Sequence, residues 1–118
     1  MDDVKITVGG RMEQDASRRF IDAWHRAERG DTFNERHLAF ESWDALARVL
    51  TTRRMELLRY VRQNKVGSIR ALAKALARDY SNVHSDVQAL IAAGLLDATG
   101  GQLRADYDAI ETRIAISA

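Results

Sequence analysis

Residues 68–96 read SIRALAKALARDYSNVHSDVQALIAAGLL, and this stretch decides the predicted fold. Its apolar residues follow the 3.6-residue period of two short amphipathic helices that are separated by a tight turn. The apolar positions are Ile69, Leu72, Ala73 and Leu76 in the first helix, and Val83, Val87, Leu90 and Ile91 in the second. The pattern predicts a helix-turn-helix whose second helix is the candidate recognition helix.

The outward face of the second helix carries short polar side chains rather than the Glu and Lys that are common on surface helices. These residues are Ser81, Asn82, His84, Ser85 and Gln88. Asn82 and Gln88 each offer a paired donor and acceptor that match the major-groove edge of adenine. His84 can donate to a base acceptor or to a phosphate, while Ser81 and Ser85 suit phosphate or water-mediated contacts.

Residues beside this helix suit contacts with the DNA backbone. Arg78 and Tyr80 lie in the turn, where a phosphate is expected, although Tyr80 fits a role in covering the core equally well. Ser68 and Arg70 are further phosphate candidates, because the exposed amides of a helix N-terminus favour anions. Asp79 is expected to cap the second helix rather than to bind DNA.

Positive charge is concentrated in the same part of the chain. Residues 51–94 carry eight basic and three acidic residues, whereas the rest of the chain carries ten basic and fourteen acidic ones. Such asymmetry is expected of a nucleic-acid contact surface on a nearly neutral protein, here of net charge +1. A solvated basic face without a partner is the alternative, above all for Arg53, Arg54, Arg59 and Arg62.

A glycine-centred hairpin is expected after the helix-turn-helix. Gly94 suits the end of the second helix, and two short strands over 95–98 and 102–105 flank a glycine pair. A hairpin in this position is called a wing, and its only basic residue, Arg104, joins the candidate DNA contacts. Residues 111–117 alternate as a last strand, which pairs with residues 4–8 of the same chain or of a partner.

Local signals also predict elements upstream. Residues 37–40 suit a short strand that leads into a helix capped by Ser42, and Thr51 or Thr52 caps the following helix, which Gly67 ends. Residues 3–8 alternate as a half-buried strand, and an amphipathic helix is expected over 12–29. That helix packs on its own domain or on a second copy.

The expected fold class is therefore mainly α with a small β component. We expect an N-terminal strand-helix extension over 1–35, which is a candidate dimerisation element. A winged helix-turn-helix DNA-binding domain is expected over 36–118.

Composition and motifs exclude several classes of protein. The chain has no cysteine, no apolar run of roughly 20 residues and no secretory signal, so we expect a cytoplasmic protein without membrane contact. No cofactor or metal is expected, because His25 and His37 have no second ligand at metal spacing. No enzyme is expected, since a phosphate loop and a zinc-protease motif are missing. A small nuclease is the strongest enzymatic alternative, but no catalytic groups stand out.

The stretch RDYSNVHSDV, residues 78–87, carries a family resemblance together with the segment FESWDALARVLTTRRMELLRYVRQ, residues 40–63. Over about 36–118 the chain resembles small prokaryotic MarR-like winged helix-turn-helix proteins, some of which look like antitoxins of type II toxin–antitoxin pairs. The resemblance implies DNA binding by residues 80–93, with Tyr80, Asn82 and His84 as matching positions. Such proteins tend to carry Lys or Arg where this chain has Ser81 and Ser85, which lowers phosphate affinity and favours a dimer on a two-fold site.

The predicted function is sequence-specific binding of double-stranded DNA by a homodimer that regulates transcription. Its half-sites are expected about 10 base pairs, or a multiple of that, apart. A narrower hypothesis is an antitoxin that represses its own operon and has a cognate toxin as second partner. The alternative from another class is a winged-helix module for protein interaction, without DNA binding, whose basic segment meets an acidic partner.

Overall fold

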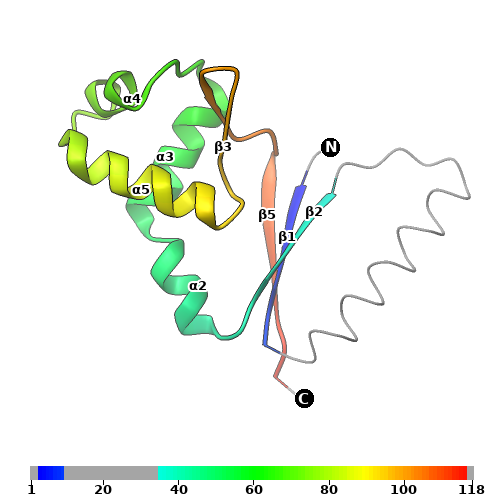
Figure 1. The fold of residues 1–118 in the computed structure, drawn as a ribbon. Coiled ribbons are helices and arrows are strands. Elements are labelled where there is room, and N and C mark those ends of the chain that lie inside the picture. The colour runs from blue at the N-terminus through cyan, green and yellow to red at the C-terminus, as the bar shows by residue number, and fades with distance from the viewer. Residues whose placement is uncertain (1–2, 10–34, 117–118) are drawn as a thin grey trace, which may run out of the picture. The chain divides into compact units, whose positions relative to one another are not determined.

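The computed structural model describes residues 3–9 and 35–116, which form two compact units (Figure 1). The first unit draws on residues within 1–46 and 107–118, and the second is continuous over 47–106. The second unit is thus inserted into the chain of the first. The helix expected over 12–29 lies outside the described residues.

The first unit is built on a three-stranded sheet whose strands are all parallel. The strands are β1 (Asp3–Val8), β2 (Glu35–Phe40) and β5 (Ala109–Ile114), in the order β2-β1-β5. The alternation in β1 buries Val4, Ile6 and Val8, each no more than 2% exposed. Parallel neighbours need long crossover connections, and the inserted unit lies within the connection from β2 to β5. Most of the buried residues described in this unit lie on the central strand, β1.

The last strand, β5, pairs with β1, one of the two alternatives that the sequence left open. In register, Asp3 lies beside Ala109 and Val8 beside Ile114, so the strand pairs within its own chain. On the other face of the sheet, the Lys5 ammonium forms an ion pair with the Glu111 carboxylate in the directly opposite position.

The expected fold class is wrong. Helices make up 44% and strands 27% of the described residues, and the largest sheet is parallel, so the chain is mixed α and β rather than a mainly α winged helix-turn-helix. Period-2 alternation predicted two of the three strands, over residues 3–8 and 111–117, and a short strand was also expected over 37–40. The alternation carried no information that strands so far apart in the sequence meet in one sheet with its own core.

The second unit begins within α2 and continues into α3, and capping side chains start both helices. Before α2 (Trp43–Val49), the Ser42 hydroxyl accepts a hydrogen bond from the Ala45 amide at 3.2 Å. Before α3 (Thr52–Gln63), Thr51 is the cap, since its Oγ1 accepts from the Arg54 amide at 3.3 Å. Both helix starts agree with the sequence prediction.

The predicted end of α3 at Gly67 is wrong. The helix ends at Gln63, where Asn64 takes an extended conformation and its amide and side chain both donate to the Tyr60 carbonyl at 3.0 Å. The chain straightens here because Val66 forms a β-bridge with Leu103, whose amide donates to the Val66 carbonyl at 3.0 Å.

The two helices predicted from residues 68–96 are confirmed as α4 (Ile69–Ala75) and α5 (Tyr80–Ala92). The Ser68 hydroxyl accepts from the Ala71 amide at 3.0 Å and starts α4. The Asp79 carboxylate accepts from the Asn82 amide at 3.2 Å and starts α5, as the sequence predicts.

Both helices end in the same hydrogen-bonded motif. After α4, the Arg78 amide donates to the Ala73 carbonyl and the Ala77 amide to the Lys74 carbonyl. This pair of bonds is the Schellman arrangement, and Ala77 takes the left-handed conformation it requires, with φ of 53°. After α5, Gly94 takes that place with φ of 82°.

A β-hairpin closes the second unit. Its strands are β3 (Asp97–Thr99) and β4 (Gln102–Arg104), which pair antiparallel across a two-glycine turn. Gly100 and Gly101 both have positive φ, as a type I′ turn demands. The core of the unit is formed by the buried residues Leu57, Leu58, Val61, Val66, Leu72, Ala73, Val83, Val87, Leu90, Leu95, Leu96, Leu103 and Ala105.

Candidate nucleic-acid interface

Helix α5 is held in place by one fully buried stripe. Val83, Val87 and Leu90 are 0% exposed, and the helix packs against α4 and α3. Three aliphatic side chains at this depth fix both the axis and the rotation of the helix, because repacking them costs several kcal/mol. The opposite face of α5 is therefore presented in one defined orientation.

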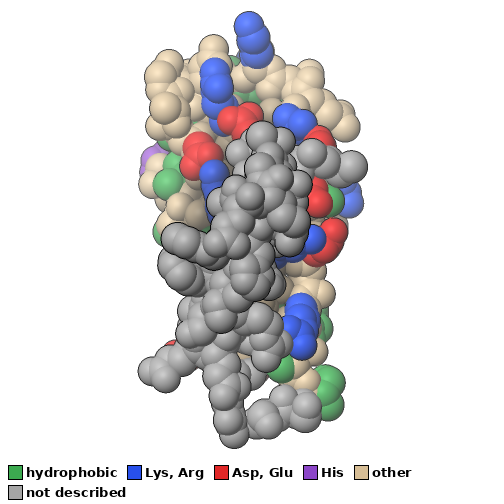
Figure 2. All heavy atoms as spheres, turned by 90° about the vertical axis from the view of Figure 1, so that its right-hand side faces the viewer, with side chains coloured by type: hydrophobic (Ala, Val, Ile, Leu, Met, Phe, Trp, Pro, Cys, Tyr) green, Lys and Arg blue, Asp and Glu red, His purple; other side chains and the backbone are tan. Residues whose placement is uncertain are grey.

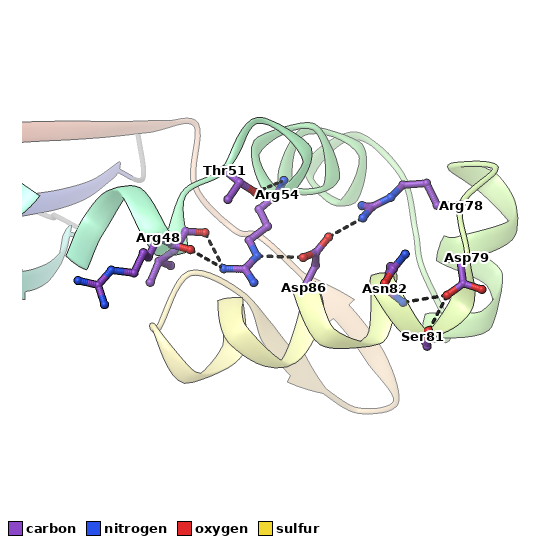
Figure 3. Close-up of polar contacts among 9 residues, drawn as sticks. Arg48, Thr51, Arg54, Arg78, Asp79, Ser81, Asn82 and Asp86 are labelled. Carbon is purple, nitrogen blue, oxygen red and sulfur yellow. Dashed lines mark hydrogen bonds and ion pairs between the residues drawn. The ribbon is translucent and has the colours of Figure 1, made fainter. Parts of the chain in front are cut away.

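Asp86 forms two ion pairs that connect α5 with Arg54 of α3 and with Arg78 (Figure 3). Its Oδ1 accepts from Arg54 Nε of α3 at 3.0 Å, and its Oδ2 accepts from Arg78 Nη2 at 2.7 Å. All three side chains are less than one-fifth exposed. Burial raises the pKa of Asp86, but the hydrogen bonds from Arg78 and Arg54 outweigh it and hold the pKa below its ordinary value. The carboxylate is thus charged and fully neutralised at neutral pH.

The same arginine of α3 also joins the end of α2. Arg54 Nη1 donates to the carbonyls of Arg48 and Val49, each at 3.0 Å. A guanidinium at these last carbonyls suits the negative end of the helix. One side chain therefore connects the end of α2 and the start of α3 to α5.

The exposed face of α5 carries no charged residue along its length. Tyr80, His84 and Gln88 repeat every four residues, with Ser81 and Ser85 on the adjoining row. Asn82 is also exposed but is two residues from His84, which separates the two side chains by about 160° around the axis. Figure 3 shows Asn82 on the side of α5 that carries Asp86. The predicted contacts therefore divide into one continuous face and one flank.

Arg70, Tyr80 and His84 form a stacked group at the start of this face. The Arg70 guanidinium lies 5.2 Å from the centre of the Tyr80 ring, and the Tyr80 and His84 ring centres are 5.9 Å apart. Tyr80 is 44% exposed, so its role in covering the core is minor. A cation over a tyrosine face adds about 0.5–1 kcal/mol at an exposed site. The stack fixes a positive charge of α4 beside the polar row of α5.

A protein-family model matches residues 49–112, which is more than half of the chain. The chain belongs to the HVO_A0114 family. The HVO_A0114 match includes all of α3, α4, α5 and the hairpin, and extends into β5. No curated protein and no solved structure matches the chain. The description of the family names neither a ligand nor an activity.

Within the HVO_A0114 region, the polar side-chain groups of three predicted contacts form hydrogen bonds inside the protein. Arg78 is held by Asp86 and its side chain is 14% exposed, which leaves little of it for a phosphate. The Ser68 hydroxyl caps α4. The Ser81 hydroxyl donates to the Asp79 carboxylate at 2.5 Å. This bond and the Asn82 amide hold the pKa of Asp79 below its ordinary value.

Arg104 is the one predicted contact that lies outside the helix pair of the HVO_A0114 region. It lines a cleft between the end of α3 and β4, together with Arg62 and Lys65. Its guanidinium lies 4.0 Å from the Asp106 carboxylate, and both side chains are more than half exposed. Such an exposed pair is weak, so the cleft keeps its basic character.

Sequence reasoning missed the Arg54–Asp86 pair of the HVO_A0114 region, since Arg54 fitted a solvated face. One signal was available: Asp86 directly precedes a buried position of the apolar stripe, and a carboxylate there needs a cation. The stack of Arg70 on Tyr80 had no such signal, because it depends on how α4 and α5 cross.

Two further findings concern the rest of the described surface. No helix among the described residues is long and apolar enough to cross a membrane. Figure 2 shows basic and acidic side chains interspersed on the part of this face that the grey residues leave visible.

Proposed function

We propose that this protein is a sequence-specific double-stranded DNA-binding regulator of transcription that works as a homodimer. The observation that carries the proposal is the charge of α5. Its only carboxylate, Asp86, is turned to the core side and neutralised by two arginines, and its exposed face bears uncharged polar side chains. A helix so arranged approaches polyanionic DNA without repulsion and offers hydrogen-bonding groups to base edges.

Two residues of the exposed face of α5 and two cations of α4 have defined roles in this proposal. Gln88 suits a bidentate pair with adenine, and His84 suits donation to a base acceptor. Arg70 and Lys74, both exposed on α4, supply charge for the phosphate backbone. The second helix of such a pair enters the major groove while the first crosses the backbone, which matches this division of residues.

The homodimer part of the proposal rests on the small number of available cations. With Arg78 engaged by Asp86, one helix pair offers few phosphate contacts, and two copies on a two-fold site double them. The narrower proposal is an antitoxin that represses its own operon, as the resemblance to MarR-like proteins implies. A small toxin-like reading frame next to the gene supports this narrower role, and an unrelated neighbour counts against it.

Selection of bound sequences from random duplex DNA tests the proposal. The full chain is incubated at about 50 mM and about 200 mM salt, and the enriched pool is sequenced at each concentration. A single enriched motif with two-fold symmetry is expected. Failure to enrich any motif at either concentration contradicts DNA reading and favours a protein-interaction module.

Alanine variants then locate the reading face. His84→Ala and Gln88→Ala each lower the affinity for the selected site about tenfold while leaving non-specific binding unchanged. Gln63→Ala is the matched control, since Gln63 is an exposed residue on α3. Asn82→Ala is a second comparison, because Asn82 lies on the flank of α5. Equal losses for all four variants would rule out a reading face made of His84 and Gln88.

A further inference from the structure

The edge strand of the sheet has a self-complementary sequence. Residues 109–115 read AIETRIA, which is symmetric about Thr112: alanine matches alanine, isoleucine matches isoleucine, and Glu111 matches Arg113 with opposite charge. The other edge strand, β2, reads ERHLAF and lacks this symmetry. A strand that is symmetric in this way complements a second copy of itself in antiparallel alignment.

The outer edge of β5 is available for such pairing. Among the described residues, β5 pairs only with β1, and it stands at the end of the sheet order. The Ala115 amide donates to the Val8 carbonyl, so the odd-numbered backbone groups point toward β1. Backbone groups alternate along a strand, and those of Ile110, Thr112 and Ile114 therefore point to the open edge.

We propose that two copies of this chain associate through antiparallel pairing of β5 with β5, on a two-fold axis at Thr112. Thr112 then lies opposite Thr112 of the second copy, and Ile110 opposite Ile114, in positions that exchange backbone hydrogen bonds. Roughly six such bonds join the two sheets. The result is one continuous six-stranded sheet in which both open β5 edges are covered.

Side chains on both faces fit this register. Glu111 lies opposite Arg113 in the closer, non-hydrogen-bonded kind of position, and the pair occurs twice. Glu111 would then sit between Lys5 of its own chain and Arg113 of the second copy, a carboxylate between two cations. On the opposite face, Ile114 is 47% exposed, and pairing with Ile110 covers it. Charge and apolar surface thus specify the same alignment.

This inference rests on the homodimer part of the proposed function and not on DNA binding. Sedimentation of the full chain is expected to give a mass of twice 13.3 kDa. Arg113→Glu places two pairs of like charges in opposition and is expected to weaken the dimer about tenfold or more. The double variant Glu111→Arg with Arg113→Glu restores opposite charges and the dimer.

A mixture of single variants sharpens the charge test. Glu111→Arg chains and Arg113→Glu chains each repel their own kind, yet together they present only opposite charges. An equimolar mixture is therefore expected to give a heterodimer while each variant alone is a monomer. Glu111→Arg also loses the ion pair with Lys5 in its own sheet, so far-UV circular dichroism monitors the fold of every variant that carries it. Arg113→Glu keeps Glu111 in place and decides the question without that substitution.

A backbone test is independent of charge. Thr112→Pro removes one outward amide and leaves the pairing with β1 intact, since proline is tolerated at an outward position of an edge strand. It is expected to abolish the dimer, whereas Thr112→Ala, which keeps the amide, preserves it. A monomeric wild-type chain, or a dimer unaffected by both Arg113→Glu and Thr112→Pro, would overturn the inference. A monomer that still enriches a DNA motif rejects the pairing and leaves DNA reading in place.

Discussion

Ala77 and Gly94 occupy the same position of two copies of one helix-ending motif, the first after α4 and the second after α5. Both residues are left-handed, with φ of 53° and 82°. The side chain of alanine makes that conformation costly, whereas glycine adopts it freely. The turn that separates the two helices of the candidate interface therefore stores a small strain that the turn after α5 does not.

Two single substitutions, Ala77→Gly and Gly94→Ala, are expected to change the free energy of unfolding in opposite directions. Ala77→Gly should raise the free energy of unfolding by about 0.5–1 kcal/mol, because it relieves the left-handed strain at the cost of some unfolded-state entropy. Gly94→Ala should lower it by about 1 kcal/mol. Urea unfolding followed by circular dichroism measures both. A loss of stability in Ala77→Gly would show that the strain is absent.

Removal of the Asp86 charge is expected to cost more than any surface substitution. Asp86→Asn leaves two arginines, each less than one-fifth exposed, without their counter-charge. The free energy of unfolding should fall by about 2–3 kcal/mol. Asp106→Asn is the matched control, because its partner is 4.0 Å away and both side chains are exposed, and it should change stability by less than about 0.5 kcal/mol. Similar losses in the two variants would contradict a structural role for Asp86.

The same carboxylate predicts a pH dependence of defined sign. The pKa of Asp86 is lowered in the folded chain from its ordinary value of 3.8, so its contribution is complete above that value and disappears as the pH falls through the folded-state pKa. The stability gap between wild type and Asp86→Asn should thus be constant above about pH 5 and close in stronger acid. Urea midpoints measured across this range test it. A gap that widens in acid would refute the ion pairs.

Arg70 gives a prediction about salt. If Arg70 contacts one phosphate from its stacked position over Tyr80, Arg70→Ala should reduce the slope of log affinity against log salt by about 0.9. Arg53→Ala changes an exposed arginine of α3 and serves as control. Fluorescence anisotropy on the selected site provides the slopes. Identical slopes for wild type and Arg70→Ala would place Arg70 away from the backbone of the DNA.

Local features of this fold were predictable because the residues that cause them are adjacent in sequence. Each capping side chain accepts a hydrogen bond from the amide three residues ahead, as at Ser42, Ser68 and Asp79. The glycine pair at 100–101 forms the turn of its hairpin. The parallel sheet was not predictable, since nothing in β1 specifies that β2 and β5 rather than a partner lie beside it. Fold class was wrong for that reason, although most of the individual elements were right.

The candidate site, like the fold, was predictable from the sequence only in part. Periodicity predicted which side chains of α5 are exposed, because burial of Val83, Val87 and Leu90 fixes the rotation of the helix. It did not predict that Arg78 is engaged by Asp86, a contact that depends on the turn at Ala77 and on how α3 lies beside α5. The helical period alone is enough to predict that the side chains of Asn82 and His84 lie on different sides of α5.

The insertion of the second unit between β2 and β5 sets an order of events at the ribosome. Strands β1 and β2 emerge early, but β5 follows only after residues 47–106 have been translated, a delay of about 3–12 s at ordinary elongation rates. During that interval β1 has one of its two neighbours, and the edge beside it is open to wrong pairing. The inserted unit, whose contacts are contained in one continuous segment, is complete by the time the sheet closes. Because β5 follows the inserted unit in the chain, two nascent chains that pair through β5 as proposed do so only after residues 47–106 of each have been translated.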